Sequence, residues 1–272
     1  MNIPTYWIRE RRMIEGRRIR LRGISADSQQ DARERMEARA RLWQQLLTAP
    51  AGSVPVEAFR AELRRLDGEA SPYSSAILEP IEQQPDADNI ITRNRYGSLV
   101  LNSISLCFVD VDRFRCGFWA SLFGGKKREE QALLEAVRRE CAADCTLSAR
   151  VYRTAHGWRV MLRGEGLSIG SAREAELFSA LQADPLYAEL CRKQLCWRAR
   201  LSPKPFYRGL KRYPLAQSSV HRPEEWISAY EKATAGLAVC RLLDSFGPPL
   251  HDAIVELHDT FTLARKCDLE LA

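Results

Sequence analysis

The chain has 272 residues, of which 45% are hydrophobic and 28% are charged, the composition of a globular protein rather than a disordered one. Its longest apolar runs are far shorter than the roughly 20 residues that cross a bilayer. Residues 1–12 also lack the apolar core of a signal peptide. These features argue against a membrane protein and a secreted protein, and we expect a cytoplasmic location with no membrane partner.

The net charge of +6 is unevenly distributed. Residues 1–22 hold seven arginines against two glutamates, and residues 190–222 hold nine lysines and arginines with no carboxylate. The second block also contains Trp197, Phe206 and Tyr207, and this mixture of cations and aromatic rings suits phosphates and bases. Charge runs are often only solvated faces and do not identify a ligand by themselves. An acidic protein partner is therefore an alternative to a nucleotide or nucleic acid.

Residues 1–90 are expected to form a basic ribbon and helices. Apolar and basic residues alternate on both sides of Glu15-Gly16, which predicts a two-stranded β-ribbon. One face of this ribbon would carry Ile8, Ile19 and Leu21, and the other would be mainly arginine.

Helical patterns follow the ribbon. From Ser25 the spacing predicts an amphipathic helix that ends before Pro50, and a second helix follows Val54. Residues 67–90 contain three prolines and a glycine, and we expect an irregular connector there.

Residues 91–222 are expected to form a central domain. Two short β runs, 98–102 and 105–111, lie around Asn102-Ser103, and a helix follows the glycines at 124–125. The clearest hairpin joins β runs 147–154 and 158–163 at His156-Gly157, and two helical stretches follow it. This order predicts an α+β fold with an antiparallel, RRM-like (palm-type) sheet and helices on one face.

Residues 223–272 are expected to form C-terminal helices packed on that core. A long amphipathic pattern begins at Pro223 and extends to Phe246, with the proline at a helix N1 position. A further helical stretch closes the chain.

The strongest chemical signal is the pair Asp110 and Asp112 at the end of the apolar run LCFVDVD. Residues i and i+2 of a strand point to the same face, so the two carboxylates would repel each other unless a cation lay between them. Mg²⁺ binds one or two carboxylates together with substrate phosphates, and we therefore expect an Mg²⁺ or Mn²⁺ site there. In the alternative interpretation both aspartates only cap the following turn or pair with nearby arginines.

Basic side chains follow in two places. Arg153 and Arg159 flank the hairpin turn, and Arg198 and Arg200 share one face of a strand-like run. Two prolines flank Lys204 and stiffen the segment that presents it. We expect these cations to bind phosphates, and the set is Arg153, Arg159, Arg198, Arg200, Lys204 and Arg208.

Two of the four histidines, His251 and His258, lie near the C-terminus and are seven residues apart. Each is followed directly by an aspartate. The pair His258-Asp259 is a candidate general base, although such residues are often polar groups on a helix surface. We keep His258 as a catalytic candidate.

The order of these parts resembles the archaeo-eukaryotic primase and primase-polymerase superfamily. The run CFVDVD resembles the metal-binding strand of that family, and YRTAHGWRV resembles its nucleotide-contacting hairpin, with Arg159 where a histidine is expected. The resemblance covers residues 96–210 at most, and the family's third acidic residue has no clear counterpart. VDVDRFR is also similar to the metal strand of nucleotide-cyclase palms.

The resemblance implies metal-assisted nucleotidyl or phosphoryl transfer, with Asp110 and Asp112 holding the metal. The sequence leaves two alternatives open. One is a non-catalytic nucleic-acid-binding accessory protein with a degenerate primase-like core. The other is a protein-interaction module that binds an acidic partner.

Overall fold

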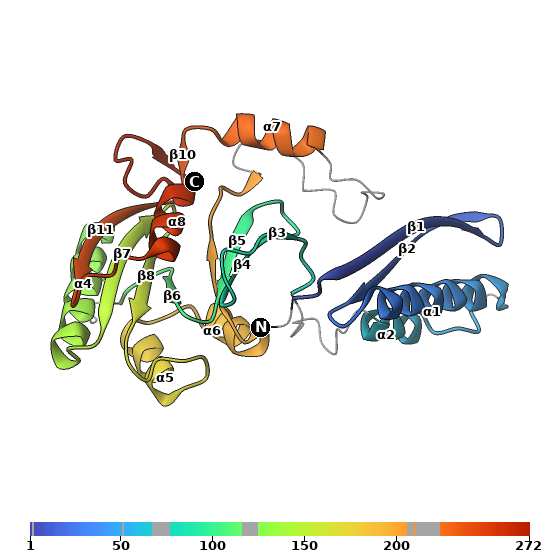
Figure 1. The fold of residues 1–272 in the computed structure, drawn as a ribbon, viewed down its shortest axis with the longest axis horizontal. Helices are drawn as coiled ribbons and strands as arrows, with labels where there is room; N and C mark the ends of the chain where they lie inside the picture. The colour runs from blue at the N-terminus through green and yellow to red at the C-terminus, as the bar shows by residue number, and fades with distance from the viewer. Residues whose placement is uncertain (2, 51, 67–76, 116–124, 206–208, 210–223) are drawn as a thin grey trace.

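The computed structural model describes the chain except residues 2, 51, 67–76, 116–124, 206–208 and 210–223. The expected α+β class is confirmed, because helices alternate with antiparallel sheets (Figure 1). No helix in the described part of the chain is both long and apolar enough to cross a membrane.

The N-terminal unit contains the expected ribbon and helices. Its elements are β1 (Tyr6–Ile14), β2 (Arg17–Ser25), α1 (Gln29–Thr48) and α2 (Val56–Leu66). Glu15 and Gly16 join the two strands with positive φ angles of 46° and 72°, as a tight type I′ hairpin turn requires. The side chain of Ser28 caps α1 by accepting a hydrogen bond from the backbone N–H of Asp31 at 3.0 Å.

This unit has a small hydrophobic core of its own, separate from the main core. One face of the ribbon packs on α1, and the buried residues are Ile14, Leu21, Met36 and Ala40. A Cβ added at Gly23 would lie 1.7 Å from the carbonyl oxygen of Ala32, so only glycine allows β2 to approach α1 this closely. In Figure 1 the unit projects from the rest of the molecule.

The main body holds two four-stranded antiparallel sheets. The first has the order β3-β4-β5-β9, formed by β3 (Ile81–Gln83), β4 (Asn89–Arg93), β5 (Leu99–Ser103) and β9 (Trp197–Arg200). The second has the order β11-β7-β8-β6, formed by β6 (Cys107–Val111), β7 (Ser148–Thr154), β8 (Trp158–Arg163) and β11 (Cys240–Phe246). The β runs around Asn102-Ser103 thus become β5 and β6, which belong to different sheets.

The remaining elements surround these sheets. They are α4 (Gly125–Ala143), α5 (Ala172–Ala180), α6 (Pro185–Gln194), α7 (Glu224–Thr234), α8 (Ala253–Thr262) and the short parallel strands β10 (Leu237–Ala238) and β12 (Glu270–Leu271). Side chains of β6 and β8 such as Phe108, Val109 and Val160 are fully buried, as expected for a sheet covered on both faces.

Helices cover opposite faces of the second sheet. Arg153 of β7 reaches Glu130 of α4, whereas its neighbour Tyr152 reaches Asp259 of α8 at 2.8 Å. Because adjacent residues of a strand point to opposite faces, α4 and α8 lie on different sides. This differs from the expected arrangement of helices on one face, and the reason is that the C-terminal segment supplies the additional layer.

The two sheets meet at a seam between β6 and β9. The hydroxyl of Tyr187, on α6, lies 2.9 Å from the carbonyl oxygen of Phe108 on β6 and 3.1 Å from that of Arg198 on β9. The backbone N–H of Asp184 also donates to the carbonyl oxygen of Asp110 at 2.9 Å. The N-terminus of α6 therefore satisfies backbone groups that an unpaired strand edge would leave open.

The C-terminal segment differs from the expected helices. The helix that begins at residue 224 ends at Thr234, and Gly236 has a φ of 82°, which breaks the helical path. Residues 240–246 then form β11, which pairs with β7 and buries Cys240. Pairing with an existing strand edge has overridden the helical spacing of this segment.

Candidate phosphate-binding site

Asp110 lies directly opposite Arg159 in the antiparallel pair β6 and β8. The Nε atom of Arg159 lies 3.1 Å from Oδ1 of Asp110, and the Arg159 side chain is 3% exposed against 37% for Asp110. A buried guanidinium is thus the ion-pair partner of the first aspartate. Asp112 follows the end of β6 and is exposed.

Gly157 lets the hairpin turn pass close to these aspartates. A Cβ at this position would lie 2.2 Å from the carbonyl oxygen of Val111 and 2.9 Å from Cα of Asp112. Only glycine permits this approach, which holds the turn between β7 and β8 against the end of β6.

Arg159 also reaches the first sheet and the C-terminal helix. Its Nη1 atom donates to the carbonyl oxygen of Arg200 at 2.9 Å and lies 3.5 Å from Nε2 of His258. Burial lowers the pKa of Arg159, but the charge and hydrogen bond of Asp110, together with Cys240 and Tyr187, raise it, and the net pKa is raised. This side chain is therefore a fixed cation that joins three parts of the fold.

His258 lies behind Arg159 and is fully buried. Its Nδ1 atom lies 3.1 Å from Oδ1 of Asp259, and Asp259 also accepts from Arg150 Nη1 at 2.9 Å. Burial and the charges of Arg159 and Arg150 lower the pKa of His258, Asp259 raises it, and the net pKa is about 4. The candidate base is thus a neutral histidine inside the core, separated from solvent.

Arg200 and Lys204 are half-buried and lie near this network. Neighbouring hydrogen bonds fix their segment, because the N–H of Leu99 donates to Ser202 Oγ at 2.8 Å and Ser98 Oγ donates to the carbonyl oxygen of Pro203 at 2.9 Å. Partial burial lowers the pKa of Lys204, and so does the charge of Arg200. The structure therefore brings Arg159, Arg200 and Lys204 together with the two aspartates.

Three other predicted cations do not join this group. Arg153 points to the opposite face of its sheet and pairs with Glu130. Arg198 shares a face of β9 with Arg200, as alternation predicts, but it is held by Glu79 and donates to Asn102 Oδ1 at 2.8 Å. Arg208 lies outside the described residues.

The residues near Asp110 form an incomplete set of metal ligands. Within the described ranges, no three His, Cys, Asp or Glu side chains are grouped closely enough to hold a metal ion. Asp110 and Asp112 are the two carboxylates available, and Arg159 already binds the first. Mg²⁺ would therefore need most of its ligands from water or substrate phosphates.

Sequence reasoning did not identify Tyr187, Arg150 or Tyr152 as part of this network. The spacing of these residues fits plain core positions. Only tertiary pairing brings Tyr187 to the carbonyl oxygen of Phe108, and Arg150 and Tyr152 to Asp259. The pairing of His258 with Asp259 is the one part of the inner network that sequence adjacency could indicate.

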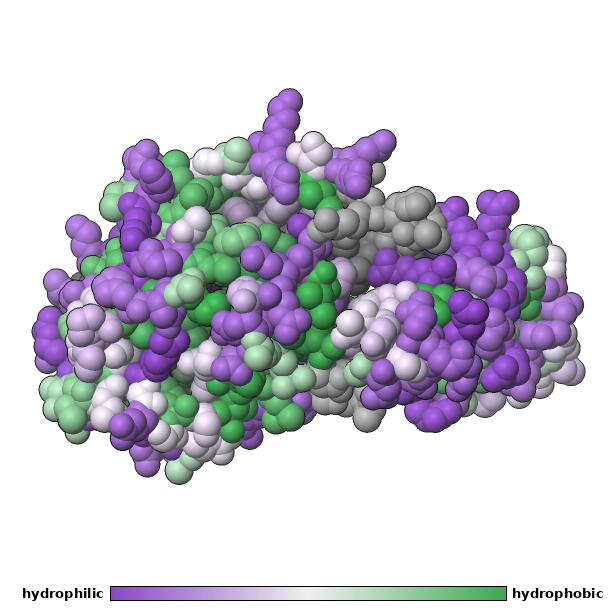
Figure 2. Space-filling view, viewed as in Figure 1, coloured by the Kyte–Doolittle hydropathy of each residue, from purple (hydrophilic) through white to green (hydrophobic). Residues whose placement is uncertain are grey.

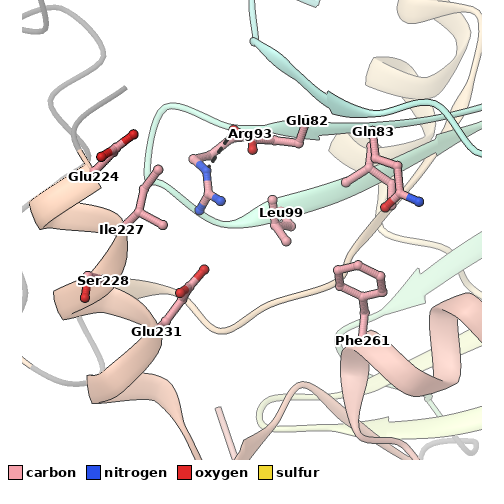
Figure 3. Close-up of a pocket in the computed structure, with 10 residues that line it drawn as sticks. Glu82, Gln83, Arg93, Leu99, Glu224, Ile227, Ser228, Glu231 and Phe261 are labelled. Carbon is pink, nitrogen blue, oxygen red and sulfur yellow. Dashed lines mark hydrogen bonds and ion pairs between the residues drawn. The ribbon is translucent and has the colours of Figure 1, made fainter. Parts of the chain in front are cut away.

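A separate pocket of about 360 Å³ lies between α7, the first sheet and α8 (Figure 3). Figure 3 shows Glu224 and Glu231 on α7 facing Arg93, Glu82 and Leu99, with Phe261 at the far side. Arg93 is bound by Glu82 at 3.1 Å and donates to the carbonyl oxygen of Gly97 at 2.8 Å. This acidic pocket contains none of the predicted phosphate-binding residues.

Comparison with protein-family models, curated proteins and solved structures finds no match to this chain.

Proposed function

We propose that this protein binds nucleic acid through a degenerate primase-like core, with Arg200 and Lys204 contacting phosphates. The observation that carries the proposal is the ion pair between Asp110 and Arg159. A fixed guanidinium occupies the carboxylate on which metal chemistry would depend, while two further cations are held beside it. This combination favours phosphate binding over catalysis.

The strand order supports the palm-type core. Across the seam the strands run β9-β6-β8-β7, and along the chain they follow the order β6-α4-β7-β8-α5/α6-β9. This order matches the β-α-β-β-α-β arrangement of ferredoxin-like and RRM-like units. In this proposal α8 is an added layer on the face that carries Asp110.

The rigidity of the basic segment supports recognition of a ligand by a prepared surface. Tyr230 of α7 donates to Ser202 Oγ at 2.7 Å, which adds to the hydrogen bonds from β5. A segment that is already ordered loses little entropy on binding. The absence of any carboxylate from residues 190–222 favours a polyanion. Trp197 takes no part in this surface, because it is buried in the main core and donates to Glu174.

Metal-dependent nucleotidyl transfer is a second candidate. It is favoured by the exposure of Asp112 and by the electrostatic effect of both aspartates on Lys204. In that case Mg²⁺ or Mn²⁺ would lie between Asp110, Asp112 and substrate phosphates, and would neutralise charge on the transferring group.

The test is binding of a labelled single-stranded oligonucleotide, measured by fluorescence anisotropy at several salt concentrations. Replacing Arg200 and Lys204 with glutamine should weaken binding, and should reduce the slope of log K against log salt by about 0.7 for each phosphate that the variant no longer neutralises. Arg138→Gln with Arg139→Gln, exposed arginines on α4, is the matched control and should change little.

A second measurement separates the candidates. Under the binding proposal, Asp110→Asn with Asp112→Asn leaves oligonucleotide affinity intact or raises it, and Mn²⁺ has little effect. Nucleotide incorporation that requires Mn²⁺ and is abolished in this double variant would instead establish the enzyme. Binding that ignores salt and the Arg200 and Lys204 changes would contradict both.

A further inference from the structure

The outer face of the N-terminal ribbon carries a ladder of arginines. Residues Arg9 and Arg22 are directly opposite each other in the register of β1 and β2, and so are Arg11 and Arg20. Arg18 is opposite Met13 at the tip end of the same face. The other face packs on α1, so these five arginines share the side that is turned away from the helix.

Such a ladder is unfavourable for the ribbon itself. Like charges directly opposite each other in an antiparallel pair destabilise it. Among the described residues, no carboxylate oxygen lies within ion-pair distance of Arg11, Arg18 or Arg20, and all three are exposed. On the inner face, by contrast, Arg12 pairs with Glu10 at 2.8 Å and with Glu37 at 2.7 Å. The inner arginine is thus neutralised, whereas Arg11, Arg18 and Arg20 of the outer face are exposed to solvent.

The shape of the ribbon restricts which polyanion fits it. Strands of nine residues span roughly 30 Å, about one turn of a DNA duplex. The ribbon projects from the main body, and the face of this unit seen in Figure 2 is largely hydrophilic. The major groove of B-form DNA is about 12 Å wide and admits a two-stranded β-ribbon, whereas the major groove of duplex RNA is too narrow for side chains to read.

We propose that the ribbon formed by β1 and β2 binds double-stranded DNA by inserting its arginine face into the major groove. Arg11, Arg18 and Arg20 contact phosphates and the guanine edges along the groove. This surface is distinct from the segment around Arg200 and does not depend on the function proposed for the core.

The test uses the full-length chain and a fluorescent DNA duplex of about 20 base pairs. Arg11→Gln with Arg20→Gln should weaken duplex binding about tenfold or more, and should reduce the salt slope by about 0.9 for each phosphate that is no longer neutralised. Arg138→Gln with Arg139→Gln removes the same charge from the main body and should leave duplex affinity within about twofold.

A charge reversal distinguishes a binding role from a structural one. Arg11→Glu places a carboxylate opposite Arg20, so it should keep or raise the melting temperature while it weakens duplex binding. If Arg11→Glu unfolds the ribbon, the arginines are structural and the proposal is wrong. Circular dichroism and anisotropy on the same sample give both readouts.

Competition with unlabelled ligands tests whether the ribbon inserts into the major groove of DNA. Unlabelled duplex DNA should displace the probe far better than duplex RNA, heparin or an acidic peptide of equal charge. Equal displacement by all of them would overturn groove insertion, and so would an unchanged affinity in the Arg11 and Arg20 variant. Failure of the Arg200 and Lys204 variants to affect single-strand binding would reject the core proposal and leave this one standing.

Discussion

At the scale of single residues, His258 shows how burial and neighbours select one protonation state. Arg159 presents an N–H to Nε2, whereas Asp259 presents a carboxylate oxygen to Nδ1. The neutral tautomer with hydrogen on Nδ1 satisfies both contacts, because Nε2 then keeps its lone pair for the guanidinium. A doubly protonated ring would place a second buried cation against Arg159.

This arrangement predicts a stability that decreases with acid. The pKa of His258 is lowered from 6.5 to about 4 by burial, so below pH 6.5 the unfolded chain binds a proton that the folded chain does not. The contribution of neutral His258 to the free energy of unfolding should therefore be complete above pH 6.5. It should fall by roughly 2–3 kcal/mol as the pH decreases toward 4. Urea denaturation at several pH values measures this decrease.

His258→Asn is the control variant, because its side-chain amide can replace Nδ1 as the donor to Asp259. The variant should lose most of the pH dependence above pH 4.5. Half-buried carboxylates such as Glu130 contribute only below this pH. Burial raises the pKa of Glu130, but Arg153 and Trp158 together lower it below the ordinary 4.5. An unchanged pH dependence in His258→Asn would show that another group is responsible.

At the scale of elements, the seam between β6 and β9 depends on Tyr187. Its hydroxyl contacts a carbonyl oxygen on each strand edge and also accepts from the N–H of Arg198 at 3.3 Å. The rigid ring of Tyr187 holds this hydroxyl between the two strand edges. Tyr187→Phe should lower the free energy of unfolding by about 1–3 kcal/mol, the cost of leaving buried polar groups unpaired.

Chemical denaturation of the Tyr187→Phe variant measures this loss. Tyr6→Phe removes a hydroxyl from an exposed residue of β1 and should change the stability by less than about 0.5 kcal/mol. Equal effects of the two substitutions would mean that the Tyr187 hydroxyl does not hold the sheets together.

Local signals in the sequence predicted several elements well. The cap at Ser28 and the turn residues Gly16 and Gly157 set local backbone geometry, and the ribbon, α1 and the hairpin of β7 and β8 form where expected. The segment that forms β11 was expected to be helical, since its apolar spacing fits both structures and only pairing with β7 decides.

The candidate site depends more on tertiary pairing. Alternation predicts which residues share a face of one strand, but it cannot give the register that sets Asp110 against Arg159. For the same reason Arg153 and Arg159, which flank one turn, end on opposite faces: Arg153 is opposite Trp158, and Arg159 is opposite Tyr152. The seam at Tyr187 has no local signal.

At the scale of the whole molecule, the hydrophobic core of the N-terminal unit is much smaller than that of the main body. The N-terminal unit buries four residues in its own cluster, whereas the cluster of the main body includes strands β6, β7 and β8 together with α4 and α8. We expect a low free energy of unfolding for a ribbon that packs on one face and carries a ladder of like charges on the other. Local unfolding free energies should therefore differ between the two parts.

We expect urea denaturation to show two transitions, the first from the N-terminal unit and the second from the main body. Gly23→Ala forces a Cβ to within 1.7 Å of the Ala32 carbonyl oxygen, so it should abolish or greatly weaken the first transition and leave the second unchanged. Leu162→Ala opens a cavity in the main core and should lower the second transition by about 2–5 kcal/mol without moving the first. Hydrogen exchange assigns each transition, because amides of β1 and β2 should exchange before those of β7 and β8. A single transition that both substitutions shift equally would mean that the ribbon and the main body fold as one cooperative unit, since neither core could then lose structure without the other.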